Sequence, residues 1–178
     1  MELLNKRGIK PRVRILLAHR DAVFSKRLAR GIAGQQDMEL CGELQSASAI
    51  AKAVRTGNPQ IAVIDLGLVE DDLLGYLRSL HAAFPSLRIL AVSGHADTEQ
   101  AECVLRAGAG GYVVQSEPLK EMLLALRIVA GGQLYVSRGA AAPLLRRLLQ
   151  SPSKISSRPS LGEHRQARVG LPPPMKSP

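Results

Sequence analysis

Short apolar runs typical of β-strands alternate with amphipathic helical patterns along most of this chain, which leaves few folds open to it. Strands are expected at 12–18, 38–44, 61–66, 87–93 and 111–115, and helices at 21–34, 47–56, 71–84, 97–107 and 119–130. The runs IAVIDL and RILAV are apolar on both faces, as in a parallel sheet covered by helices on both sides. Because parallel crossovers are right-handed, the sequence predicts an α/β protein with a doubly wound, five-stranded parallel sheet.

Polar residues stand where the expected strands end. In a doubly wound sheet these carboxyl ends meet at one edge, which is where ligands bind. Asp65 ends the most apolar strand, where a carboxylate is unfavourable unless it has a partner or a chemical role; a turn or helix-capping role is the simpler alternative. The other strand ends contribute His19, Arg20, Asp21, Ser93 and Gln115. A carboxylate, a hydroxyl and an amide at one edge predict a polar site.

Motifs of nucleotide-dependent enzymes and hydrolases are missing from the sequence. The turn after the first expected strand reads AHRDAV, without GxGxxG, and no GxxxxGK[ST] motif occurs. Ser93-Gly94-His95 lacks the glycine that precedes the serine in GxSxG, and one nearby histidine does not define a triad. We therefore expect a protein that is not an enzyme and has no catalytic residues.

Three stretches of residues 12–137 carry a family resemblance: VRILLA, then IAVIDLGLVEDDLLGYLRSLHAAFPSLRILAVSGHAD, then LRAGAGGYVVQSEPLKEMLLALRIVAGGQLYVS. In this order and spacing they resemble the receiver domain of response regulators, of the kind attached to LuxR-type DNA-binding domains, which has a flavodoxin-like fold. An Asp after the third strand, a Ser or Thr after the fourth and RAGAxGY before the fifth are specific together and weak singly. The resemblance implies that Asp65 is the phosphoacceptor, that Ser93 contacts the phosphoryl group and that Tyr112 is the switch aromatic.

The same resemblance implies a function in phosphorelay signal transduction within a two-component system. Phosphorylation would favour one of two conformers, and the face formed by the fourth helix, fifth strand and fifth helix would repack for a partner. The implied partner is a sensor histidine kinase or another signalling protein.

Three departures from the family pattern alter the expected phosphoacceptor pocket. His19 and Arg20 replace the acidic pair that helps to hold Mg²⁺, and Gln115 replaces the lysine after the fifth strand. Asp21 is offset by one residue and is expected to be a helix N-cap. Because Mg²⁺ prefers carboxylate oxygens, we expect no metal and no cofactor, with Arg20 pairing with Asp65 through a two-pronged contact instead. These residues predict a phosphorylation-deficient pseudo-receiver that acts through protein contacts.

The formal net charge of +9 is concentrated at the two ends of the chain. Residues 1–20 carry +5 and residues 138–178 carry +7, whereas residues 21–137 carry −3. A solvated basic leader at 1–11 and a solvated tail are the favoured interpretation, and contact with nucleic acid or anionic lipid is the alternative.

Past residue 137 the sequence predicts a helix at 138–150, with Leu144, Leu145, Leu148 and Leu149 on one stripe. Residues 151–178 are rich in Pro, Ser and basic residues and are expected to form a disordered tail. A complete helix-turn-helix domain is not expected there, because Pro172-Pro173-Pro174 would stop a helix. The alternative function is a truncated or atypical DNA-binding transcriptional regulator that contacts phosphates through this tail.

Three further expectations concern association and location. Leu119, Leu123 and Leu126 could mark an exposed face for a homodimer, although packing of all three on the sheet is favoured. No apolar run approaches the roughly 18 residues of a membrane span, and no signal core begins the chain. Cys41 and Cys103 form no CxxC pair, which is typical of buried thiols in a reducing compartment. A cytoplasmic protein is expected.

Overall fold

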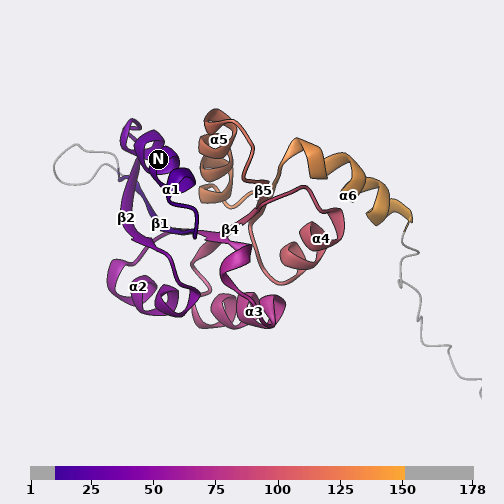
Figure 1. Ribbon diagram of the computed structural model, residues 1–178, viewed down its shortest axis with the longest axis horizontal. Helices are drawn as coiled ribbons and strands as arrows, with labels where there is room; N and C mark the ends of the chain where they lie inside the picture. Colours follow the sequence, from indigo (N-terminus) through magenta and orange to yellow (C-terminus); the bar gives the residue numbers. More distant parts are fainter. Residues whose placement is uncertain (1–10, 151–178) are drawn as a thin grey trace, which may run out of the picture.

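The computed structural model describes residues 11–150, which form a parallel β-sheet with helices on both faces (Figure 1). The sheet has six strands in the order β2-β1-β3-β4-β5-β6. The strands are β1 (Val13–Ala18), β2 (Met38–Leu44), β3 (Ile61–Asp65), β4 (Arg88–Ser93), β5 (Gly111–Val114) and β6 (Tyr135–Val136). All neighbouring pairs are parallel, so the predicted α/β doubly wound architecture is confirmed.

Six α-helices and two 3₁₀ turns connect and follow the strands. They are α1 (Ala22–Ala33), η1 (Ala47–Ala49), α2 (Ile50–Gly57), η2 (Leu66–Leu68), α3 (Leu73–Ala83), α4 (Thr98–Arg106), α5 (Leu119–Ala130) and α6 (Arg138–Gln150). Helices α1 and α5 cover one face of the sheet, and α2, α3 and α4 cover the other (Figure 1). Helix α6 follows β6 at the sheet edge and packs against α4.

The central strand β3 supplies both hydrophobic cores. Ala62 and Ile64 pack toward α2, α3 and α4, whereas Ile61 and Val63 pack toward α1 and α5. Every residue of β3 is buried, including Asp65 at its end. Because side chains alternate between faces, a slip of one residue would exchange the two cores, so packing fixes the strand register and the position of Asp65.

Aspartates cap the helices that leave the carboxyl edge of the sheet. Asp21 accepts hydrogen bonds from the backbone amides of Val23 and Phe24, which confirms its predicted role as the N-cap of α1. Asp97 caps α4 in the same way, through the amides of Glu99 and Gln100. These caps fix the first turns of the helices that surround the predicted site.

The predicted strand count of five is one too low. The extra strand, β6, has two residues and pairs with β5, where Tyr135 lies opposite Gly111 and Val136 opposite Tyr112. A segment this short has no periodicity of its own, and its hydrogen bonds to β5 make it a strand.

The predicted leucine face of α5 is directed inward. Leu126 is fully buried and Leu123 nearly so, and both belong to the core beneath α5. Leu119 packs against Gly31 of α1, where an added Cβ would lie 2.6 Å from its Cδ1. The favoured expectation, packing on the sheet, is confirmed for Leu123 and Leu126, while Leu119 is half-buried against α1, so these three leucines do not form the exposed face that the homodimer alternative required.

Two predicted regions fall largely or wholly outside the described residues: the basic leader at 1–11 and the disordered tail at 151–178. Within the described part of the chain, none of the helices has the length and apolarity to cross a membrane.

Candidate functional site

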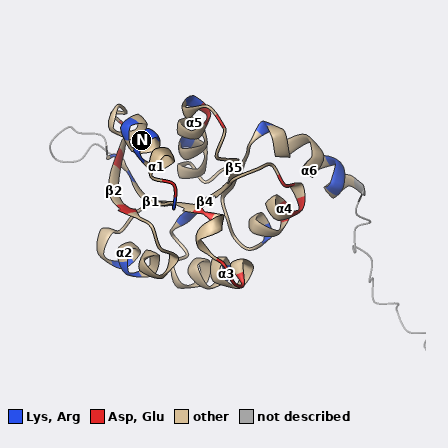
Figure 2. Cartoon of the chain, in the orientation of Figure 1, with Lys and Arg blue, Asp and Glu red and all other residues tan. Residues whose placement is uncertain are grey.

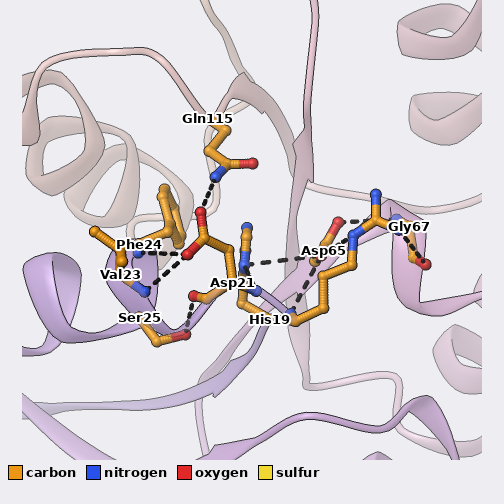
Figure 3. A network of polar contacts seen from close by, with 9 residues as sticks. His19, Asp21, Val23, Phe24, Ser25, Asp65, Gly67 and Gln115 are labelled. Atoms are coloured by element: carbon orange, nitrogen blue, oxygen red, sulfur yellow. Dashed lines mark hydrogen bonds and ion pairs between the residues drawn. The ribbon is translucent and has the colours of Figure 1, made fainter.

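The predicted site residues lie at the carboxyl edge of the sheet, but in three hydrogen-bonded groups. Asp65 and Ser93 are the last residues of β3 and β4. His19 and Arg20 follow β1, and Gln115 follows β5. Figure 3 shows Asp65 next to His19 and Gly67, with Gln115 turned toward Asp21.

Both carboxylate oxygens of the buried Asp65 have partners. Oδ1 accepts the backbone N–H of Gly67 at 2.9 Å. Oδ2 lies 3.3 Å from Arg20 Nε and accepts the backbone N–H of Arg20 at 3.3 Å. The predicted pairing of Arg20 with Asp65 is confirmed. Its geometry differs from the expected two-pronged contact, because Nε and the backbone amide of Arg20 meet one oxygen.

The absence of a side chain at Gly67 leaves space for the Arg20 guanidinium. Nη1 of Arg20 donates to the Gly67 carbonyl at 3.3 Å, so the side chain extends from Asp65 to the β3–α3 loop. A Cβ on residue 67 would collide with the guanidinium of Arg20. The Arg20 side chain is 66% exposed, whereas the side chain of its partner Asp65 is only 6% exposed.

His19 is a buried, neutral neighbour of Asp65. Its Nδ1 accepts the backbone N–H of Asp21 at 3.0 Å and lies 3.7 Å from Asp65 Oδ2. Its ring stacks on Phe24 with centroids 4.1 Å apart, and Nε2 has no hydrogen-bond partner among the described residues. Burial lowers the pKa of His19, and the charges of Asp65 and Asp21 offset this only in part. The ring therefore fills space beside Asp65 without adding a positive charge.

The second group joins Gln115 to Asp21. Nε2 of Gln115 donates to Asp21 Oδ2 at 2.7 Å, while Asp21 Oδ1 caps α1. Arg27 donates from Nη2 to the Gln115 carbonyl at 2.9 Å. The backbone amides of Val23 and Phe24 hold the pKa of Asp21 below its usual value. These contacts direct Gln115 toward α1, beside a surface cavity of about 420 Å³.

The third group connects Ser93 to α4. Ser93 Oγ donates to Gln100 Oε1 at 2.8 Å, and the Tyr112 hydroxyl donates to the His95 carbonyl at 3.1 Å. The Tyr112 ring is fully buried, and its hydroxyl also accepts the backbone N–H of Asp97 at 3.3 Å. The first turn of α4 is thus bonded to both predicted signalling residues, Ser93 and Tyr112.

Sequence reasoning missed Gly67 and Gln100. Gln100 follows Ser93 by seven residues and lies in the first turn of α4. Because Asp97 marks the start of this helix, the sequence could have placed Gln100 near the end of β4. Gly67 had no such signal, because its importance depends on where the Arg20 side chain lies.

The described residues fit a divalent cation poorly. They contain no cluster of three His, Cys, Asp or Glu side chains that could bind a metal. One oxygen of Asp21 caps α1 and the other accepts from Gln115, while a guanidinium lies beside Asp65 Oδ2. Magnesium needs several oxygen ligands in octahedral geometry, and this arrangement does not offer them.

A parallel sheet of this order, with a buried aspartate ending β3, a serine ending β4 and a buried tyrosine in β5, defines a receiver-type α/β protein. The comparison with protein families agrees: the response regulator receiver domain matches residues 15–127. The chain belongs to this family and is a receiver domain of a two-component response regulator.

The alignments of this chain with curated relatives extend beyond the residues that match the receiver domain. The chain is 25% identical over 159 residues to the DNA-binding transcriptional activator DevR/DosR of Mycobacterium tuberculosis, covering 89% of this chain and 73% of the relative. It is 26% identical to the response regulator GacA of Pseudomonas protegens, covering 89% of this chain and 74% of GacA. These alignments are longer than the receiver match itself.

Solved structures share the fold. A LuxR-family two-component response regulator from Aurantimonas sp. SI85-9A1 superimposes with a TM-score of 0.72 at 23% identity, over 78% of this chain and 99% of that one. The isolated REC domain of RcsB from Salmonella enterica serovar Typhimurium, in the presence of phosphomimetic BeF3−, gives 0.68 at 15% identity, over 75% and 99%.

Proposed function

We propose that this receiver domain is a signalling module that acts through protein contacts, with Arg20 in the place where a metal ion would neutralise Asp65. The observation that carries this proposal is the 3.3 Å contact between Arg20 Nε and Asp65 Oδ2. Asp65 is the candidate phosphoacceptor, Ser93 the candidate phosphoryl contact and Tyr112 the candidate switch aromatic. None of these roles makes the protein an enzyme.

Charge counting supports slow or absent phosphoryl transfer to Asp65. A phosphoryl group brings close to two negative charges, and its transfer is fast where positioned cations neutralise them. His19 is buried and its pKa is lowered, and Gln115 is neutral and bonded to Asp21. Arg20 is the single cation in contact with Asp65 among the described residues, and it lies across one of the two oxygens that would react.

The contacts of Ser93 and Tyr112 indicate which surface a partner protein would bind. A sensor histidine kinase or another signalling protein would bind the face formed by α4, β5 and α5. The start of α4 in this face is hydrogen-bonded to Ser93 and Tyr112. Because Arg20 already neutralises Asp65, that face would be held in one resting conformation whether or not phosphate is available.

The test compares the natural protein with Arg20→Asp combined with Gln115→Lys. We expect the double variant to bind Mg²⁺ by calorimetry and to incorporate phosphate from a small-molecule phosphodonor at least about tenfold faster, measured by mass. Lys52→Asp on the exposed face of α2 controls for the charge change at residue 20. Adding Asp65→Asn should abolish the gained label. The proposal is wrong if the natural protein binds Mg²⁺ at sub-millimolar concentration and labels as readily as the double variant.

The alternative of a DNA-binding regulator depends on residues 151–178, which lie outside the described residues. DevR/DosR, one of the relatives, is named as a DNA-binding transcriptional activator. Binding to duplex DNA of mixed sequence, with an affinity that falls steeply as salt rises, would support this alternative.

A further inference from the structure

Exposed large apolar side chains gather at one end of the molecule, on α6 and the loop before β6. Six such side chains are exposed in the described residues, and four belong to this region. They are Leu134, Leu145, Leu148 and Leu149, with 63%, 59%, 44% and 78% of their surface exposed. An apolar patch of this kind, surrounded by charged residues, is typical of a protein interaction site.

A groove lies beside these leucines, between α4 and α6. It holds about 280 Å³. Its lining consists of Glu102, Leu105, Arg106, Leu134, Leu144 and Leu148. Leu144 is nearly buried at its base, whereas Leu134 and Leu148 are exposed at its rim. The groove therefore has room for apolar side chains from outside.

The two helices that form the groove carry opposite charges. Helix α6 contains Arg138, Arg146 and Arg147 and no acidic residue. Helix α4 carries acidic residues and α6 carries basic ones (Figure 2), and Glu99 and Glu102 of α4 contact α6. Arg147 contacts both glutamates within the chain, at 2.8 Å and 3.4 Å. The Glu99 side chain remains 72% exposed, so it can accept a second cation.

We propose that a second copy of this chain docks on this surface. Leu145 and Leu149 of each α6 enter the α4–α6 groove of the other copy, and Arg146 of each faces Glu99 of the other. Leu145 and Leu149 are four residues apart and point the same way, so they enter one groove together. Each copy carries both the projecting leucines and the groove, so a two-fold axis satisfies both contacts and closes the assembly at two chains.

The surface of this dimer does not include Asp65, so a test of the dimer and a test of the proposed function can give different outcomes. It also differs from the α5 arrangement described above, because Leu145 and Leu149 of α6 are exposed. An Asp65→Asn variant should dimerise as the natural protein does.

Analytical ultracentrifugation of the full chain at high micromolar concentration tests the apolar contact. We expect a concentration-dependent dimer, with a Kd at least about tenfold weaker for Leu145→Gln and for Leu149→Gln, a change of about 1.4 kcal/mol that is typical of removing a central apolar contact. Leu124→Gln on α5 is the control, because Leu124 is another exposed leucine, 44% exposed, and does not line the groove. It should leave the Kd unchanged.

A charge exchange tests the pairing of α6 with α4 of the other copy. Arg146→Glu and Glu99→Arg should each weaken the dimer, and the combined variant should recover most of the natural Kd. A monomer at all concentrations overturns the proposal, as does a dimer that both leucine substitutions leave intact. Flotation of a monomeric chain with vesicles containing anionic lipid would assign the patch to a membrane surface and overturn it as well.

Discussion

At the scale of single residues, the site is defined by how the chain neutralises one buried carboxylate. Asp65 was identifiable from sequence because an acidic residue ending an apolar strand is rare without a partner. Arg20 was identifiable as that partner because β1 and β3 are neighbours in a doubly wound sheet. The side-chain directions of Gln115 and Ser93 were beyond sequence reasoning. They depend on competing partners, Asp21 for Gln115 and Gln100 for Ser93.

His19 makes the stability of the protein depend on pH. Burial lowers its pKa in the folded protein below the ordinary histidine value of about 6.5, so the unfolded chain binds more protons at mildly acidic pH. The contribution of neutral His19 is fully present above pH 6.5 and is lost as the pH falls from there toward the lowered pKa. We expect the free energy of unfolding in urea to fall from about pH 7 to about pH 5.

His19→Asn should flatten this pH dependence, because the amide oxygen can still accept the Asp21 N–H but does not titrate. His81→Asn, at an exposed histidine of α3, controls for the loss of one histidine. Equal slopes in the natural protein and His19→Asn would contradict the assignment.

At the scale of elements, α4 is the helix most closely tied to the candidate site. Its cap, Asp97, accepts from two amides, and the backbone of Asp97 donates to the Tyr112 hydroxyl. The sequence predicted this helix well, since Asp97 before an amphipathic run is a start signal. It did not predict β6, because two residues become a strand only when β5 lies beside them.

Removing the α4 cap should loosen the helix at the end nearest the site. We expect Asp97→Ala to lower the free energy of unfolding by about 1 kcal/mol and to speed amide exchange in the first turn of α4. Asp97→Ser should restore most of the loss, because serine is also a good cap. Asp71→Ala, at an exposed carboxylate in the β3–α3 loop, is the control. Equal effects of Asp97→Ala and Asp71→Ala in urea unfolding and hydrogen exchange would show that the cap does not hold this turn.

At the scale of the whole molecule, stability is divided between the doubly wound body and α6. The body has helices on both faces of the sheet, with cores that share β3. Helix α6 lies beside α4 at the edge of these layers (Figure 1) and packs mainly on α4. Ala140 reaches the core on the α4 side, Leu144 is also buried, and Arg147 forms ion pairs with α4. Alternating strands and helices therefore sufficed to predict the body. The docking of α6 needed the position of α4.

This division predicts different outcomes for two buried leucines. Leu126→Ala, in the core beneath α5, should lower the global free energy of unfolding by about 2–5 kcal/mol. Leu144→Ala should instead release α6, because Leu144 is buried but belongs to neither core of the sheet and lines the groove between α4 and α6. Hydrogen exchange would then show lost protection in α6 with the strands still protected, and urea unfolding would change by less than for Leu126→Ala. Loss of protection throughout the sheet in Leu144→Ala would mean that α6 and the body unfold as one cooperative unit.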